Sequence, residues 1–498
     1  MKQNRAIHIF VLLMFSATGF IVAGYHPGAE DDAVYLSAVK SDVYPTLYPH
    51  DSDFFKLQLH ATAFDELMAS FVRATSISVA WSEFLWQFLS ILLVLVACHS
   101  IICQLFEEQT ARWGGIAMLT AMFTLPVAGT ALYIVDQYLH PRALATSLIL
   151  FSVSRIMAGK RWQAAPLLIA AFALHPLMGA LGISFCCVLT ITFSEPLQIR
   201  LREWRQREIA QATIPVAALI PFGWLLDPPS KTFLDAISTR HSFHLYQWTW
   251  YEWLGAIGPL VIFWIVSRVA RQHGEIKLAR FAMAILIYGF LQQAVAMIML
   301  GPKELVVLSA LEPMRYLHLV YIFLALVLGA YLGKYVLRNH VWRWTLFLLL
   351  ANGGMFLAQR QLFVATEHIE LPNARSGNHW LQAFEWIRVN TPADAYFAMD
   401  PNYLAAPGED YHSFRALAER SQLADAVKDT SIITKVPDLG PAWERQVTAQ
   451  AGWTRFQLAD FERLKAQFGV NWVLVSYPQP AGLACRWHND TLAACQIP

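Results

Sequence analysis

The sequence lacks the patterns by which many soluble enzymes are recognised. It has no Gly-rich phosphate loop, no Ser/His/Asp arrangement for catalysis and no nucleotide-binding signature. Its six cysteines do not follow a zinc-binding spacing. Charged residues make up only 15% of the chain and the formal net charge is +1, which argues against a nucleic-acid-binding protein. The hydrophobic segments and the placement of the few charges therefore carry most of the information.

Long hydrophobic segments are abundant. Hydrophobic residues account for 56% of the chain, with 18 Trp and 31 Phe. A membrane-spanning helix requires about 20 predominantly apolar residues. About eleven candidate segments are present, near residues 6–24, 77–105, 113–135, 143–158, 163–174, 177–193, 209–226, 253–270, 279–300, 314–333 and 341–358. We expect an α-helical polytopic membrane bundle over residues 1–358.

The basic residues predict how the chain crosses the membrane. Lys2 and Arg5 precede the first segment, so we expect a cytoplasmic N-terminus. An odd number of spans then places the C-terminus outside, which is the periplasm for a bacterial inner membrane. The expected cytoplasmic connections and the helix ends beside them contain Arg112, Arg155, Lys160, Arg161, Arg200, Arg202, Arg205, Arg207, Arg268, Arg271, Lys277, Arg280, Lys334, Arg338 and Arg343. A cleavable signal peptide, with Val22 and Gly24 before the cut, is the alternative for the first segment.

Residues 163–193 have two interpretations. They form either one long kinked helix or two short helices that turn at His175-Pro176. Basic residues near both ends favour two helices, because both ends then lie in the cytoplasm. Proline lacks a backbone donor and disfavours helical geometry in the residue before it, which suits a break at this point.

From about Gln359 the composition becomes that of a soluble domain, residues 359–498. Helices are expected at 380–389 and 458–468, and strands at 395–399 and 470–475. This alternation predicts a small extracytoplasmic α/β domain. Cys485 and Cys495 flank a hairpin-like stretch, and in an oxidising compartment we expect them to form a disulfide.

Many acidic residues lie at the expected outer surface, and none lies near the middle of a span. Ion-coupled transporters usually need carboxylates within the membrane. The most unusual group is Glu30-Asp31-Asp32, near the start of the first outer loop, residues 25–76. A helix N-cap explains one of these acids, but three are present. After Asp51-Ser52-Asp53 we expect a second helix of the loop, with apolar positions from Phe54 to Phe71.

Four short motifs lie along the chain: Asp136–Arg142, His175–Leu177, Leu311–Arg315 and Trp386–Pro392. Together with the long first outer loop, its paired acids, the many-span bundle and the outer C-terminal domain, they resemble the GT-C superfamily of integral-membrane glycosyltransferases. Protein O-mannosyltransferases and the lipid A aminoarabinose transferase belong to this superfamily. The motifs are similar to an uncharacterised bacterial branch of it, which implies a GT-C-like fold.

The resemblance implies transfer of a sugar from a polyprenyl-phosphate donor, with inversion, to a glycan, lipid or protein acceptor outside the membrane. Asp31 or Asp32 would be the general base that deprotonates the acceptor hydroxyl. Glu30 would orient the loop, or the three acids would hold a divalent cation such as Mg²⁺ or Mn²⁺. Members of the superfamily differ over metal dependence. The lack of a nucleotide-binding signature fits a lipid-linked donor.

The leaving phosphate requires positive charge near the outer leaflet. Arg315 is the first candidate because a guanidinium binds phosphate oxygens with two parallel hydrogen bonds, and Arg142 and Arg240 are second candidates. Interfacial snorkelling is the alternative explanation for these arginines. Further candidate site residues are Asp136, His140, His175 and His241, although a helix break alone explains His175.

Two questions stay open at the level of the sequence. The first is whether the polar residues of the C-terminal domain face an acceptor or form a solvated helix face; these are Arg415, Arg420, Asp425 and Lys428. The second is the class of protein. The alternatives to a transferase are a transporter or flippase of a polyprenyl-linked glycan intermediate, and a non-catalytic membrane assembly protein. All three partner with membrane lipids and none with nucleic acid.

Overall fold

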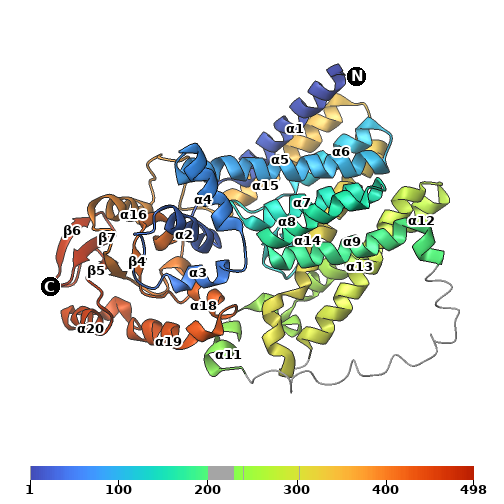
Figure 1. Ribbon diagram of the computed structural model, residues 1–498. Helices are drawn as coiled ribbons and strands as arrows, with labels where there is room; N and C mark the ends of the chain where they lie inside the picture. Colours follow the sequence, from blue (N-terminus) through green and yellow to red (C-terminus); the bar gives the residue numbers. More distant parts are fainter. Residues whose placement is uncertain (1, 200–228, 239, 302) are drawn as a thin grey trace.

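The computed structural model describes residues 2–199, 229–238, 240–301 and 303–498 (Figure 1). This part of the chain is mostly helical, and it ends in a small domain built on a five-stranded sheet. The two chain termini lie at opposite ends of the molecule in Figure 1. The expected span at 209–226 and the basic cluster from Arg200 to Arg207 fall outside the described residues.

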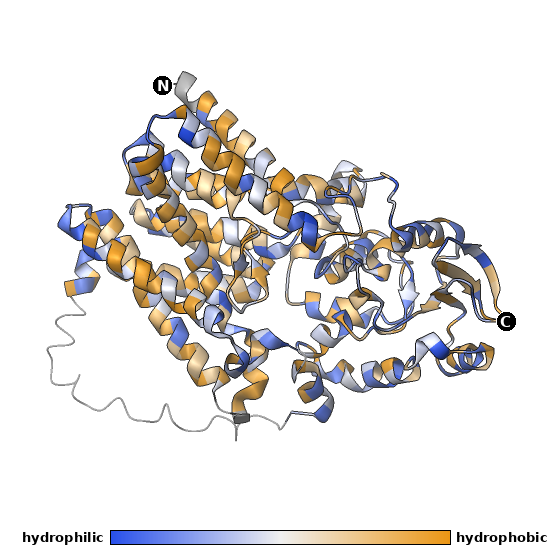
Figure 2. Cartoon of the chain, turned by 180° about the vertical axis from the view of Figure 1, so that it is seen from behind, coloured by the Kyte–Doolittle hydropathy of each residue, from blue (hydrophilic) through white to orange (hydrophobic). Residues whose placement is uncertain are grey.

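Seven helices of the described part are long and apolar enough to cross a membrane. They are Ala6–Ala23 within α1 (Lys2–Ala23), α5 (Val79–Leu105), α9 (Pro176–Phe193), α12 (Trp250–Gln272), α13 (Ile276–Leu300), the segment Leu305–Leu337 and α15 (Val341–Leu362). The segment Leu305–Leu337 contains α14 (Leu317–Tyr331), which is buried along most of its length. Along α15 the side chains of Leu349 and Leu350 are each 67% exposed, which suits a lipid-facing helix. Figure 2 shows how hydrophobic residues predominate in these helices.

The expected span at 113–135 is not one helix, and that prediction is wrong. Helix α6 (Gln109–Ala121) ends early, and a hairpin of β1 (Pro126–Val127) and β2 (Leu132–Tyr133) follows. Pro126 lacks a backbone donor, and Gly129 adopts a φ of +61° that favours glycine. The apolar run therefore folds back on itself before it reaches Asp136.

The turn at His175-Pro176 is confirmed. Helix α8 (Arg161–Leu174) ends before His175, whose backbone is extended, and α9 begins at Pro176. The His175 Nδ1 atom accepts a hydrogen bond of 3.4 Å from the Met178 backbone N–H, so the histidine caps α9. Both helices pack against α7 (Pro141–Met157).

The first loop, residues 25–76, lies between the long helices and the C-terminal domain (Figure 1). It forms α2 (Asp32–Val43), α3 (Asp53–Leu59) and α4 (Phe64–Thr75). The single second helix expected from Phe54 to Phe71 is therefore two helices. The Ala63 N–H between them donates to the Ala173 carbonyl at 2.9 Å, at the end of α8. The Asp51 carboxylate contacts Tyr396 and Gln446 of the C-terminal domain.

The C-terminal domain has the expected α/β character. Its sheet has the order β4-β3-β5-β7-β6, with parallel pairing among the first three strands and antiparallel pairing among the last three. A disulfide joins Cys485 and Cys495, which face each other across β6 and β7. The strands are β3 (Tyr396–Ala398), β4 (Ser421–Gln422), β5 (Trp472–Ser476), β6 (Ala484–His488) and β7 (Leu492–Gln496), and the helices are α16 (His379–Asn390), α17 (Phe414–Ala418), α18 (Lys428–Ile433), α19 (Gly440–Ala449) and α20 (Leu458–Phe468).

The C-terminal domain packs directly on the first loop. Helix α17 contacts α2, and α18 contacts α3. Helix α11 (Lys231–Ser238) contacts α18 and α19. These contacts bring residues near position 30 next to residues beyond position 410, so the candidate site is assembled from both ends of the chain.

Candidate functional site

The acidic triplet lies on a short loop, His26–Asp32, that the backbone holds in place from two sides. The His26 N–H donates to the Gln137 carbonyl at 2.8 Å, on the side of the long helices. The Ser413 N–H donates to the Gly28 carbonyl at 2.8 Å, on the side of the C-terminal domain. Gly28 has a φ of +75°, a conformation that L side chains rarely adopt. We call this segment the acidic loop.

Asp32 stabilises the acidic loop from within. Its side chain is buried, and its Oδ2 atom accepts a hydrogen bond of 2.5 Å from the Gly28 N–H. It also lies beside the Glu83 carboxyl group, and burial raises the pKa of Asp32 to about 6. Because this carboxylate is enclosed and already bonded to its own loop, it is poorly placed to meet a substrate.

Glu30 and Asp31 are the two partly exposed acids of the triplet. The Asp31 side chain is 42% exposed and that of Glu30 is 41% exposed, and Asp31 makes no capping hydrogen bond to α2 although it occupies the N-cap position. The Lys428 ammonium group donates to Asp31 Oδ1 at 2.8 Å and to Glu30 Oε2 at 2.9 Å. Burial acts to raise the pKa of Asp31, but the charge of Lys428 outweighs it and holds that pKa well below its usual range. The Asp31 side chain therefore does not cap α2.

His140 approaches Asp31 from the helical part. Its Nε2 atom is 3.9 Å from Asp31 Oδ2, while its Nδ1 atom accepts a hydrogen bond of 2.9 Å from the Arg142 backbone N–H. Burial, followed by the charge of Arg142, lowers the pKa of His140 well below its usual range. A neutral ring that accepts at Nδ1 carries its proton at Nε2, so it presents an N–H toward Asp31.

Two arginines lie in the same region. Arg142 is buried, and its guanidinium group is 2.7 Å from both carboxylate oxygens of Asp136. Arg315 pairs with Glu312, which also accepts from Lys435 at 2.7 Å. Both arginines are therefore tied to acids, which is inconsistent with free snorkelling to an interface.

His175 belongs to the same cluster. Its ring stacks on that of His140, with centroids 5.7 Å apart. Burial is the main reason why the pKa of His175 is lowered well below its usual range, and the charges of Arg142 and Arg315 add to the effect. The structure thus brings together six residues singled out from the sequence: Asp31, Asp136, His140, Arg142, His175 and Arg315.

Two candidate residues lie elsewhere. The Arg240 guanidinium donates to the Val427 carbonyl at 3.1 Å, so it braces the residue before Lys428. His241 is about half exposed and pairs with Glu252 at 2.9 Å, at the start of α12. Neither contacts the acidic loop. Arg240 supports the start of α18 through its hydrogen bond to Val427, and His241 is outside the cluster.

Lys428 was not among the sequence-based site residues, although it lies in the polar stretch of the C-terminal domain. That stretch is not a solvated helix face, since Arg415, Arg420, Asp425 and Lys428 are all buried. Arg415 pairs with Asp429 at 2.7 Å, and Asp425 caps α18 through the Lys428 N–H. No local signal marks Lys428, because its partner Asp31 is 397 residues away in the sequence.

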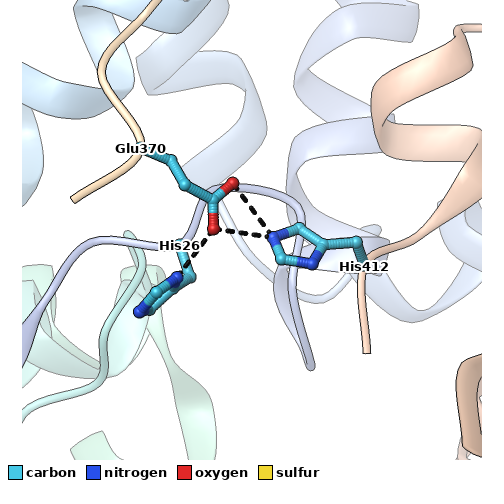
Figure 3. A group of neighbouring side chains, drawn as sticks. All are labelled: His26, Glu370 and His412. Carbon is cyan, nitrogen blue, oxygen red and sulfur yellow. Dashed lines mark hydrogen bonds and ion pairs between the residues drawn. The ribbon is translucent and has the colours of Figure 1, made fainter. Parts of the chain in front are cut away.

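A divalent cation was one of two roles considered for the acidic triplet, and the three carboxylates are not arranged around a common point. Glu30 and Asp31 both bind Lys428, whereas Asp32 turns toward the Gly28 N–H. Within the described ranges, one other group has the spacing of metal ligands: His26, Glu370 and His412 (Figure 3). Sequence reasoning missed it because its members come from three distant segments.

No protein-family model matches this chain, and no curated protein matches it. At this site two partly exposed carboxylates, Glu30 and Asp31, meet cationic groups from the helical part and from the C-terminal domain.

Proposed function

We propose that this protein is a membrane glycosyltransferase of the GT-C type. It transfers a sugar from a polyprenyl-phosphate donor to an acceptor at the periplasmic face of a bacterial inner membrane. The observation that carries the proposal is Asp31, an exposed carboxylate that binds Lys428 and has His140, Arg142 and Arg315 around it. A base beside cationic groups is what an inverting transfer from a phosphate leaving group requires.

The chemistry conserves charge within the site. The acceptor oxygen attacks the anomeric carbon, the bond between that carbon and the phosphate oxygen breaks, and the acceptor proton passes to the Asp31 carboxylate. The donor phosphodiester carries one negative charge and the released phosphomonoester carries up to two. The charge gained by the phosphate equals the charge that Asp31 loses on protonation. Lys428 donates a hydrogen bond to Asp31, so its ammonium group can turn from the carboxylate to the phosphate as the negative charge moves there.

Lys428 also explains how Asp31 becomes a base only when donor is bound. In the free protein the ammonium group lowers the pKa of Asp31, which makes the carboxylate a weak base. A donor phosphate competes with Asp31 and Glu30 for the three N–H donors of Lys428. When the ammonium group turns to the phosphate, it lowers the pKa of Asp31 less. Burial, which acts in the opposite direction, then raises that pKa. Donor binding thus prepares the base for the acceptor.

The contacts at the two ends of the helical part support the sidedness of this proposal. Lys334 pairs with Glu108 at 2.8 Å and with Glu275 at 3.2 Å, which joins three connections expected in the cytoplasm. The acidic loop gathers residues from connections expected outside.

A topology experiment tests the sidedness. Reporter fusions after Asn373, an exposed loop residue, are expected to show a periplasmic signal. Fusions after Gly274, in a connection expected in the cytoplasm, serve as the matched control and should show the opposite signal. A cytoplasmic signal at Asn373 would place the site on the wrong side for a polyprenyl donor in the outer leaflet, and would end the proposal.

The transfer itself is tested by the glycans that the protein makes. Mass spectrometry of envelope glycans, with and without the gene, should show one sugar missing from an acceptor in the strain without it. Polyprenyl-phosphate sugar should accumulate in the same strain. If both glycans and lipid-linked sugars are unchanged, the transferase proposal fails.

A further inference from the structure

A second cluster of polar side chains lies at the start of the acidic loop and serves no role in the proposed transfer. His26 follows α1, Glu370 lies in the segment after α15, and His412 precedes α17 (Figure 3). The His26 Nδ1 atom is 2.7 Å from Glu370 Oε1, and the His412 Nε2 atom is 3.0 Å and 3.1 Å from the two oxygens of the same carboxylate. One ligand atom from each residue fits within 4.8 Å of the others.

The cluster is buried and has a supporting layer of its own. His26 is fully buried and His412 is 7% exposed. The Thr366 hydroxyl lies 2.9 Å from Glu370 Oε1 and 2.8 Å from Asp410 Oδ2. Asp410 in turn accepts hydrogen bonds from two backbone N–H groups, those of Val364 and Ala365. Outer groups of this kind orient the ligands of protein metal sites.

The backbone fixes the three segments relative to one another. Tyr25 pairs with Ile369, and Ala29 pairs with His412, as isolated β-bridges. The His26 ring is also stacked on Phe363, with centroids 3.9 Å apart and planes 6° from parallel. Side chains held in this way need little rearrangement to bind a ligand, which lowers the entropic cost of binding.

We propose that His26, Glu370 and His412 bind one divalent transition-metal ion of the zinc type. Two imidazole nitrogens and a carboxylate oxygen are a donor set that such ions accept, whereas Mg²⁺ prefers oxygen ligands. Ligand atoms about 2.0 to 2.2 Å from a tetrahedral zinc are about 3.3 to 3.6 Å from one another. The two N···O separations, 2.7 Å and 3.0 Å, must widen by about 0.3 to 0.9 Å, and the two imidazole nitrogens lie within 4.8 Å of each other, so small side-chain rotations are needed to enclose an ion.

With these three protein ligands the fourth position of the ion is taken by water, and the ion serves to position the acidic loop, separately from the transfer step. It joins the end of α1, the segment after α15 and the C-terminal domain. It therefore fixes the start of the acidic loop, which contains Asp31. The competing explanation is a purely hydrogen-bonded triad, in which Glu370 accepts from both histidines and no ion binds. The two explanations differ in metal uptake, which can be measured whether or not the protein is a transferase.

The experiment uses the full chain without a histidine tag, purified in detergent, stripped with a chelator and dialysed against Zn²⁺. Wild-type protein is expected to retain close to one zinc per chain by plasma mass spectrometry. Glu370→Gln and His412→Asn are expected to fall to background. His241→Asn is the matched control and should retain zinc, because His241 has a carboxylate partner, Glu252, but no second imidazole in its pair.

Two further measurements complete the test. Thr366→Val, which removes the hydroxyl beside Glu370, is expected to weaken zinc affinity about 10- to 100-fold. Zn²⁺, and not Mg²⁺, is expected to raise the melting temperature of the wild type, because an ion that binds only the folded state stabilises it. The proposal is overturned if folded wild-type protein retains no zinc, or if the Glu370 and His412 variants retain as much as wild type. The wild-type result decides alone if these variants do not fold.

Discussion

Replacing Asp31 by Asn is expected to lower sugar transfer about 10²- to 10⁴-fold, the usual contribution of a general base. The amide has nearly the shape of the carboxylate but cannot accept the acceptor proton. Asp31 is partly exposed and bonds through its side chain to Lys428, so the substitution leaves the packing of the first loop unchanged. The detergent-purified protein is incubated with polyprenyl-phosphate sugars from native membranes. The initial rate at which these lipid-linked sugars are consumed is measured.

Two other acids of the first loop serve as comparisons for Asp31. Asp53→Asn, at the first position of α3, is expected to leave the transfer rate unchanged. Asp32→Asn is expected to lower the thermal stability, because it weakens the hydrogen bond from the Gly28 N–H, with a smaller effect on rate than Asp31→Asn. If Asp31→Asn inserts correctly and transfers at the wild-type rate, the enzyme interpretation should be dropped. Loss of lipid translocation with intact transfer would instead indicate a flippase.

Replacing Lys428 by Gln is expected to lower transfer about 10²- to 10³-fold, comparable to the removal of one donor that stabilises a developing negative charge. It should also change the pH dependence. Lys428 holds the pKa of Asp31 well below its usual range, whereas burial acts to raise it. Without the ammonium group the pKa of Asp31 rises, so the carboxylate becomes protonated at a higher pH. The acidic limb of the profile of kcat/KM should therefore move to higher pH.

Lys428→Arg is the matched variant for this experiment. It keeps the positive charge but changes the shape of the donor group, so we expect a smaller loss of rate and an acidic limb close to that of the wild type. A merely structural role for Lys428 would lower the amount of folded protein in both variants without moving the limb. An unchanged limb in Lys428→Gln, with a rate near that of wild type, would remove Lys428 from the mechanism.

Much of the architecture followed from local patterns. The break at His175-Pro176 was predictable because proline acts on its own residue and on the one before it. The α/β character of the C-terminal domain followed from short apolar strands between amphipathic helices. The prediction of one spanning helix at 113–135 was wrong because hydropathy alone does not distinguish a spanning helix from an apolar hairpin. The prediction of a single second helix in the first loop was wrong because the helix is interrupted at Ala63. The Ala63 N–H donates its hydrogen bond to the Ala173 carbonyl, on another helix.

The sequence by itself determined that the chain has long apolar helices, a C-terminal domain and an acidic triplet after the first helix, because these features depend on residues close together in the chain. Only the tertiary structure decided that Asp32 is enclosed and Asp31 is open, since both acids have the same chemistry and adjacent positions. It also supplied Lys428 as the partner of Asp31 and assembled His26 with Glu370 and His412. The contacts of Asp31 with Lys428 and of His26 with Glu370 join segments more than 300 residues apart, and their energies arise only when packing removes the groups from water and brings them together.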